Sequence, residues 1–267
     1  MIDIGIITGS GIYELSRGQG QESRVVQSRF GDTEVAIFRV GSWTVGGISR
    51  HGKRHHHLSH TVPHRANLMA LEQLGARAVL ATTVVGAVDP GIRLGQPILF
   101  DDLYFPENRL PSGEACTIFT EPGDARRGHF IGSPFSPSLR RKMELSARGL
   151  GIEVVVGGVY AHTNGPRFES RAEIKALNAA GVAAVSQTCG PEAVLAGELG
   201  LTYGLVGFPV NYATGVAELE SKEDLDRLLS LSAKILPRIA LRTVEVLEVG
   251  DLTFDHGYVY RFGGGTG

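Results

Sequence analysis

The stretch GVAAVSQTCGPEAVLAGELGLTYGLVGFPV, residues 181–210, decides the fold class. Its apolar runs VAAVS (182–186) and TYGLVGFPV (202–210) have the lengths of buried strands. Between them, Pro191 is well placed in the first turn of a helix that ends at Gly200. A strand, a helix and a second strand in this order indicate an α/β protein with a central, largely parallel sheet. Ligands of such sheets bind at the carboxyl ends of the strands.

The same alternation extends along the rest of the chain. We expect strands at IGII ahead of the turn TGSG (8–11), and at EVAIFRV (34–40), SWTVGGI (42–48), RAVLATTVV (77–85) and EVVVGGVYA (153–161). Further helices are expected after Pro63 with Gly75 as the cap, over Glu169 to Ala180, and after a capping box at Ser221 and Asp224, with a kink or break at Pro237. No linker divides the chain, so we expect one domain over residues 1–250 and a C-terminal tail over residues 251–267, ending in a loose RFGGGTG.

Composition restricts the class of partner. The chain has 267 residues, is 42% hydrophobic and carries a formal net charge of −2, which gives no general reason to expect nucleic acid or an anionic membrane as a partner. The N-terminus MIDIGIITGSG has no basic region followed by a long apolar run, and no apolar stretch reaches the length that crosses a bilayer. With only two cysteines, the composition predicts a cytoplasmic protein with reduced thiols.

The stretch HGKRHHHLSHTVPHRAN (51–67) holds six of the nine histidines. No Asp or Glu occurs between Val35 and Leu71, so the carboxylates that usually orient metal-bound imidazoles are missing nearby, and we expect no metal. Arg50 offers a rigid fork of donors and His51 an imidazole of tunable charge, which suit a phosphate. A plain solvated loop is the alternative interpretation.

Other residues of the anion-binding type stand at strand ends. Ser10 in the turn TGSG offers a hydroxyl among small residues, and Thr82, Thr83 and Thr188 add hydroxyls elsewhere. The turn is not a dinucleotide fingerprint, because Glu14 stands where its third glycine belongs. A tight turn and ordinary strand and cap threonines are the plainer interpretations.

The order of the segments TGSGI, SRHG, HRANLMALEQLGARAVLATTVVGAV, GPRFES, QTCGPEAVLAGELGL and FPVNYATG resembles the trimeric purine nucleoside phosphorylase and 5'-methylthioadenosine phosphorylase family. This resemblance implies a single α/β domain with a mixed central sheet flanked by helices. It also implies a homotrimer or a dimer of trimers, with active sites near subunit interfaces. Inorganic phosphate would be a co-substrate, with a nucleoside as the other substrate and no further cofactor.

The resemblance assigns roles to individual residues. Phosphate would be bound by Ser10, Arg50, His51, Thr83 and Thr188. The nucleoside would be bound by Phe168, Glu169, Gln187, Asn211 and His129. Phe168 would pack on the purine, and His129 would reach the 5' end of the sugar in a neighbouring subunit. Catalysis would depend on Arg50, His51 and Asn211. Relatives usually have Met at the position of Gln187, and that Met lies against the ribose. They often have Tyr at the position of His64.

Asn211 and Glu169 carry the substrate prediction. An amide can donate to a purine O6 while it accepts from a protonated N7, and an ionised carboxylate suits the N1–H of a 6-oxopurine. Methylthioadenosine-type members have Asp at the position of Asn211 and again at that of Ala213. We therefore expect phosphorolysis of inosine, guanosine or 5'-methylthioinosine in purine salvage. The alternatives are a 5'-methylthioadenosine phosphorylase, a nucleosidase that uses water, and a catalytically silent purine or phosphate binder.

Overall fold

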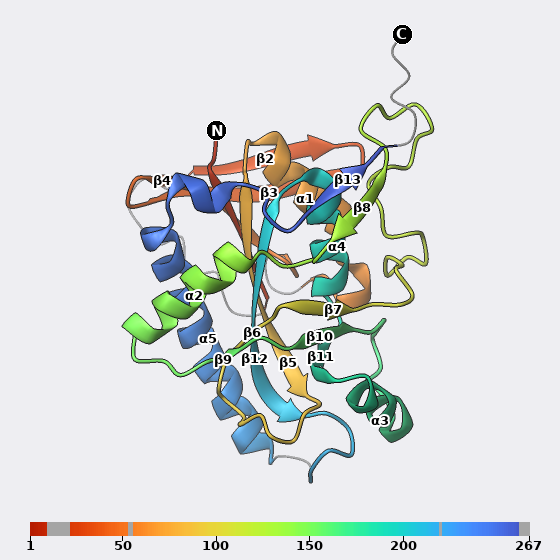
Figure 1. The fold of residues 1–267 in the computed structure, drawn as a ribbon, viewed down its shortest axis with the longest axis vertical. Helices are drawn as coiled ribbons and strands as arrows, with labels where there is room; N and C mark the ends of the chain where they lie inside the picture. The colour runs from red at the N-terminus through yellow and green to blue at the C-terminus, as the bar shows by residue number, and fades with distance from the viewer. Residues whose placement is uncertain (10–21, 53–55, 219–220, 262–267) are drawn as a thin grey trace.

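A central sheet lies between two layers of helices (Figure 1), as the α/β prediction requires. A computed structural model describes residues 1–9, 22–52, 56–218 and 221–261 of the chain. Helices α2 (Pro137–Gly149) and α5 (Lys222–Val246) cover one face, and α1 (His64–Gln73) and α4 (Cys189–Leu199) lie on the other side. Helix α3 (Arg171–Ala179) packs against β11 in a separate cluster.

The strands of the main sheet are β1 (Ile4–Thr8), β2 (Glu22–Ser28), β3 (Gly31–Val40), β4 (Trp43–Ser49), β5 (Ala78–Ala87), β6 (Ile98–Leu99), β7 (Asp102–Tyr104), β9 (Val155–Val156), β10 (Val159–His162), β11 (Val182–Ser186) and β12 (Thr202–Tyr212). Strands β8 (His129–Gly132) and β13 (Gly257–Tyr260) form a separate antiparallel ribbon. Short 3-10 helices cover Ser59–Thr61 and Val249–Leu252.

Strand β5 is the centre of the sheet. It pairs in parallel with β1 on one edge and with β12 on the other, while β11 pairs antiparallel with its last residues. The sheet is therefore parallel at its centre and mixed as a whole, which confirms the predicted fold class. Pairing with β1 stops at Ala81 and pairing with β11 starts at Gly86, so residues 82–85 have no strand partner on that edge. The carboxyl ends of β1 and β11 meet at this gap.

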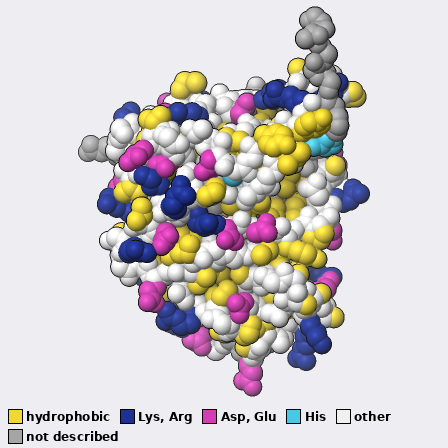
Figure 2. All heavy atoms as spheres, in the orientation of Figure 1, with side chains coloured by type: hydrophobic (Ala, Val, Ile, Leu, Met, Phe, Trp, Pro, Cys, Tyr) yellow, Lys and Arg dark blue, Asp and Glu magenta, His cyan; other side chains and the backbone are white. Residues whose placement is uncertain are grey.

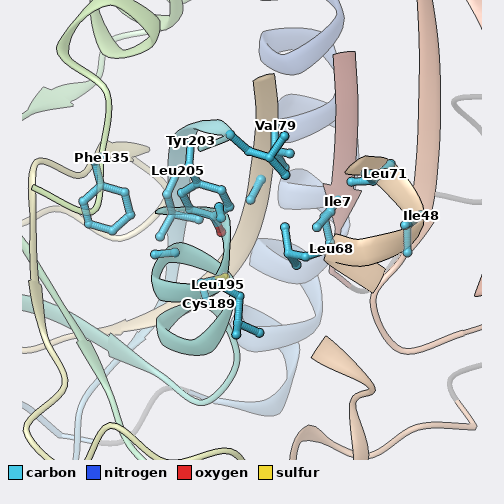
Figure 3. Packing of buried hydrophobic residues seen from close by; sticks show 14 of the residues in the cluster. Ile7, Ile48, Leu68, Leu71, Val79, Phe135, Cys189, Leu195, Tyr203 and Leu205 are labelled. Atoms are coloured by element: carbon cyan, nitrogen blue, oxygen red, sulfur yellow. The ribbon is translucent and has the colours of Figure 1, made fainter. Parts of the chain in front are cut away.

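The core holds the strand ends in place from both faces. On one face, Leu68 and Leu71 of α1 pack with Ile7 and Ile48 of the strands (Figure 3). On the same face, Leu195 of α4 lies beneath β12, and all of these side chains are almost fully buried. A second cluster joins α2 and α5 to the opposite face of the sheet. Burial of each such side chain stabilises the fold by about 1.5–3 kcal/mol.

Two sequence predictions differ from the structure. The segment 153–161 is two short strands, because Gly157 and Gly158 adopt φ values of +90° and +137° that end β9 and start β10 anew. Of the kink or break expected at Pro237, the break does not occur, because α5 continues through this residue. Beyond residue 250, β13 pairs with β8, and the last residues 262–267 lie outside the described part of the chain.

The surface mixes charges of both signs (Figure 2). Among the described residues no helix is both long enough and apolar enough to cross a membrane. Both cysteines, Cys116 and Cys189, are free and buried.

Candidate active site

The gap beside β5 is where the strand ends bring polar side chains together. Arg50 directly follows β4, and its backbone N–H donates to Thr8 O at 2.9 Å, which fixes it next to the end of β1. Gly9 allows a close approach at this point, because a Cβ there would lie 3.3 Å from Arg50 Nη1. The first turn of α4 faces the same gap from the carboxyl end of β11.

Arg50 is held by a carboxylate that sequence reasoning missed. Its Nε and Nη2 donate to the two carboxylate oxygens of Glu192 at 2.5 and 2.9 Å, and Nη1 donates to Thr82 O at 2.9 Å. Both side chains of the ion pair are fully buried. Burial alone would raise the pKa of Glu192, but the charge and hydrogen bonds of Arg50 lower it to about 2. The pair is therefore fully ionised at neutral pH.

Thr83 and Thr188 flank the same place. Thr83 Oγ1 donates to Val84 O at 3.0 Å and lies 3.4 Å from Ser186 Oγ, at the end of β11. Thr188 Oγ1 lies 3.7 Å from the Cys189 thiol, whose pKa burial raises to about 11 although Arg50 lowers it. The structure thus brings Arg50, Thr83 and Thr188 to one gap. Ser10 lies outside the described residues.

His51 is oriented by its own loop. Its Nδ1 lies 2.9 Å from His57 O, and the ring is half-buried directly after Arg50. The other histidines of the loop are partly outside the described residues, since positions 53–55 are not placed. Among the described residues, no group of three His, Cys, Asp or Glu side chains has the geometry of a metal site.

Glu169 and Asn211 lie on segments that meet at the same edge of the sheet. Glu169 is 9% exposed and accepts from Thr163 Oγ1 at 2.5 Å. Asn211 is half-buried near the end of β12, opposite Gly86 of β5, and its Nδ2 donates to Tyr212 O at 2.8 Å. The two segments contact each other beyond these residues, because the side chain of Arg171 packs against Gly215.

Phe168, next to Glu169, is 78% exposed. A large aromatic side chain held on the surface in this way is available to stack on a planar ligand.

Gln187 joins two loops. Its Oε1 accepts from Ser59 Oγ at 3.0 Å and its Nε2 donates to Arg167 O at 2.8 Å. Both ends of the amide are therefore bonded to protein, and a contact with the ribose remains a prediction. The amide ties the histidine-rich loop to the loop that carries Phe168 and Glu169.

His129 is not brought to this place within one chain. It is exposed at the start of β8, opposite Tyr260 in the peripheral ribbon (Figure 1). Its predicted role in a neighbouring subunit remains a prediction.

Two further buried side chains were missed besides Glu192. His64, at the start of α1, and His162, at the end of β10, are 2% and 4% exposed. The signal for Glu192 was present, because it is one of two acidic residues, with Glu198, in the mainly apolar segment CGPEAVLAGEL of α4. Nothing comparable indicated His162.

Comparisons with known proteins find relatives over most of the chain. A sequence profile of the phosphorylase superfamily matches residues 3–245. A Pyrococcus furiosus protein named 6-oxopurine nucleoside phosphorylase is 31% identical over 88% of this chain and 93% of its own length. A Methanopyrus kandleri protein named as a probable S-methyl-5'-thioinosine phosphorylase is 33% identical over 93% and 91%. A solved structure of Schistosoma mansoni methylthioadenosine phosphorylase with adenine has a TM-score of 0.80 and 25% identity over 91% of both chains.

Proposed function

The chain belongs to the phosphorylase superfamily, and on that premise we propose that it is a purine nucleoside phosphorylase, a pentosyltransferase that acts on 6-oxopurine nucleosides. The observation that carries the proposal is the placement of Arg50, Thr83 and Thr188 at a gap in the sheet whose edge also bears Glu169 and Asn211. An oxyanion and a purine can then be held on the two sides of one glycosidic bond.

The proposed chemistry needs no covalent enzyme intermediate. A phosphate oxygen bonds to the anomeric carbon while the bond from that carbon to the purine nitrogen breaks, through an oxocarbenium-like state. Arg50, His51 and the hydroxyls hold the dianion in line, and its charge stabilises the cationic sugar. Asn211 donates to O6 and accepts from N7–H, so that it stabilises the negative charge that develops on the departing base. The products are the free base and ribose 1-phosphate or its 5-methylthio analogue.

Inosine, guanosine and 5'-methylthioinosine are the proposed substrates. The relatives above are named for both kinds of sugar. The structural neighbour is named for methylthioadenosine, which has a 6-amino group. Asn211 and Ala213 argue against that substrate here, because a 6-oxopurine needs a donor opposite O6 and Asn supplies one.

A panel of nucleosides with and without phosphate tests the proposal. We expect hypoxanthine release from inosine or 5'-methylthioinosine only when phosphate is present, with much slower turnover of adenosine and methylthioadenosine. Release without phosphate would indicate a nucleosidase, and faster turnover of 6-aminopurines a methylthioadenosine phosphorylase. Binding of hypoxanthine without any turnover would indicate a silent binder.

We further propose a homotrimer, or a dimer of trimers, that works in purine salvage in the cytoplasm. The exposed position of His129 supports shared sites, because a residue on a peripheral ribbon is accessible to a neighbouring copy. Light scattering should give a mass three or six times the 28.5 kDa of one chain. A monomer would contradict this.

A further inference from the structure

Two buried histidines lie beside the Arg50–Glu192 pair without hydrogen-bond partners. Neither ring nitrogen of His64 or of His162 has a partner, although these atoms are inaccessible to solvent. Buried polar side chains in folded proteins nearly always have at least one partner. Two exceptions next to a buried ion pair therefore require a physical reason.

Glu192 lies between a guanidinium and an imidazole. Its Oε1 accepts from Arg50 Nε at 2.5 Å and lies 3.7 Å from His64 Nδ1. The second distance is within ion-pair range but longer than a hydrogen bond, so Glu192 and His64 are close without sharing a hydrogen bond. His162 cannot supply a charge there, because burial and the neighbouring His64 lower its pKa to about 3.

The charges of Arg50 and Glu192 at the gap beside β5 do not by themselves favour binding of a dianion. The bidentate pairing lets Glu192 cancel most of the charge of Arg50, and an oxyanion that entered would face a nearly neutral pair in buried surroundings. A proton on His64 would give Glu192 a second cationic partner and restore a net positive charge. We therefore propose that His64 takes up a proton when an oxyanion binds beside Arg50, so that the pocket binds the anion and the proton together.

The surroundings of His64 fit this role. Glu192 is the acidic side chain that faces it, and His64 is the first residue of α1. The other titratable or charged side chains around it are Arg50, His162 of β10 and Tyr203 of β12, whose hydroxyl donates to Glu192 Oε2 at 3.1 Å, with His60 and Arg65 on its own segment. Helix α1 also packs against β2 and β3, whose buried side chains Val26, Thr33, Val35 and Phe38 do not titrate.

A surface cavity of about 340 Å³ adjoins His64, and His60, Arg65 and Glu114 also line it. The imidazole nitrogens of His64 are not exposed to this cavity.

The proposal rests on the proposed function, since it concerns the phosphate site, and sulfate allows a separate test. Sulfate stays a dianion at neutral pH, so any proton taken up must go to the protein. Calorimetric titration of the full chain with sulfate, at one pH near 7 in two buffers of different ionisation enthalpy, gives the number of protons bound. We expect uptake of up to one proton per site in the wild type, and a sulfate Kd that rises up to about tenfold per pH unit above neutrality.

His64→Gln should abolish this uptake, and His60→Gln is the matched control because His60 lines the same cavity. Uptake that persists in His64→Gln would assign the proton to another group, such as His51, and overturn the proposal. Wild-type binding of sulfate without uptake would also overturn it, whether or not the variants fold, and would leave phosphate-dependent cleavage of inosine untouched. Absence of sulfate binding would remove the oxyanion site and the coupling with it.

Discussion

At the scale of single residues, the proposed phosphate site depends on the Arg50–Glu192 ion pair, and only Arg50 was identified from the sequence. Arg50 was predicted from its donors and from the absence of carboxylates around it. The acidic Glu192 in an apolar helix was visible in the sequence, but its pairing with Arg50 could not be predicted, because the two residues are 142 positions apart and only the fold brings them together. A buried charge that loses its partner is strongly destabilising, whereas an exposed pair contributes little.

Glu192→Gln should therefore lower the free energy of unfolding by about 3–5 kcal/mol, because Arg50 is left charged and buried without a counter-charge. Urea unfolding measures this, and saturating phosphate should restore part of the loss. Glu173→Gln is the control, since its partner Arg167 is 69% exposed, and the expected loss there is much smaller. Equal losses in the two variants would refute this account of the pair.

Asn211→Asp should shift the preference toward 6-aminopurines, because a carboxylate cannot donate to O6. The ratio of kcat/KM for inosine to that for adenosine should fall by about tenfold or more, since a mismatched polar contact costs at least that much discrimination. An unchanged ratio would show that this amide does not read the base.

At the scale of elements, the regular strands were predictable and the irregular ones were not. The strands at 34–40, 182–186 and 202–210 correspond to β3, β11 and β12, because each is an apolar run bounded by turn residues. Helix α2 and strand β2 were missed. Strand β2 is mostly exposed and has no apolar run, so its pairing with β3 is what defines it.

The ribbon β8–β13 was also beyond sequence reasoning, because its partners are far apart in the chain. It depends on close backbone contact at Gly132, whose φ is +147° and whose Cβ would lie 2.3 Å from His256 O. His256 anchors the segment, since its Nε2 accepts from Tyr203 N at 3.2 Å and its Nδ1 lies 2.8 Å from Ser133 O.

Gly132→Ala should detach β13 from β8. The amides of Val259 and Tyr260 should then exchange with deuterium at least about tenfold faster, as expected for a loss of 1.4 kcal/mol or more of local stability. Gly149→Ala, in the last turn of α2 with no atom near the added carbon, should change stability by no more than about 1 kcal/mol. Unchanged exchange in Gly132→Ala would show that the ribbon tolerates the added carbon.

At the scale of the whole molecule, buried ionisable groups make the fold sensitive to acid. Burial lowers the pKa of His162 to about 3 and also lowers that of His256, so the folded chain holds both neutral while the unfolded chain protonates them. Their contribution is present above the unfolded value of 6.5 and is lost as the pH falls toward the folded values. Glu192, with a pKa of about 2, acts in the same direction below 4.5.

The free energy of unfolding should therefore fall below pH 6.5, by about 1.4 kcal/mol per pH unit for His162 down to about pH 3, with a contribution of the same sign from His256. His162→Leu should remove one proton from this dependence between pH 6.5 and about 3. Urea unfolding at several pH values measures the slope. If His162→Leu keeps the wild-type slope, this histidine is not neutral in the folded chain.

The separation of Arg50 from Glu192 also has a consequence for biosynthesis. A ribosome that adds about 5–20 residues per second needs roughly 7–28 s to travel from one codon to the other. During that interval the nascent polypeptide carries the Arg50 guanidinium without its counter-charge. Its first strands are not yet covered by α4 or joined to β12 through β5. Stalling before residue 192 would leave a nascent chain that cannot bind an anion, and chaperones would have to shield it until translation resumed.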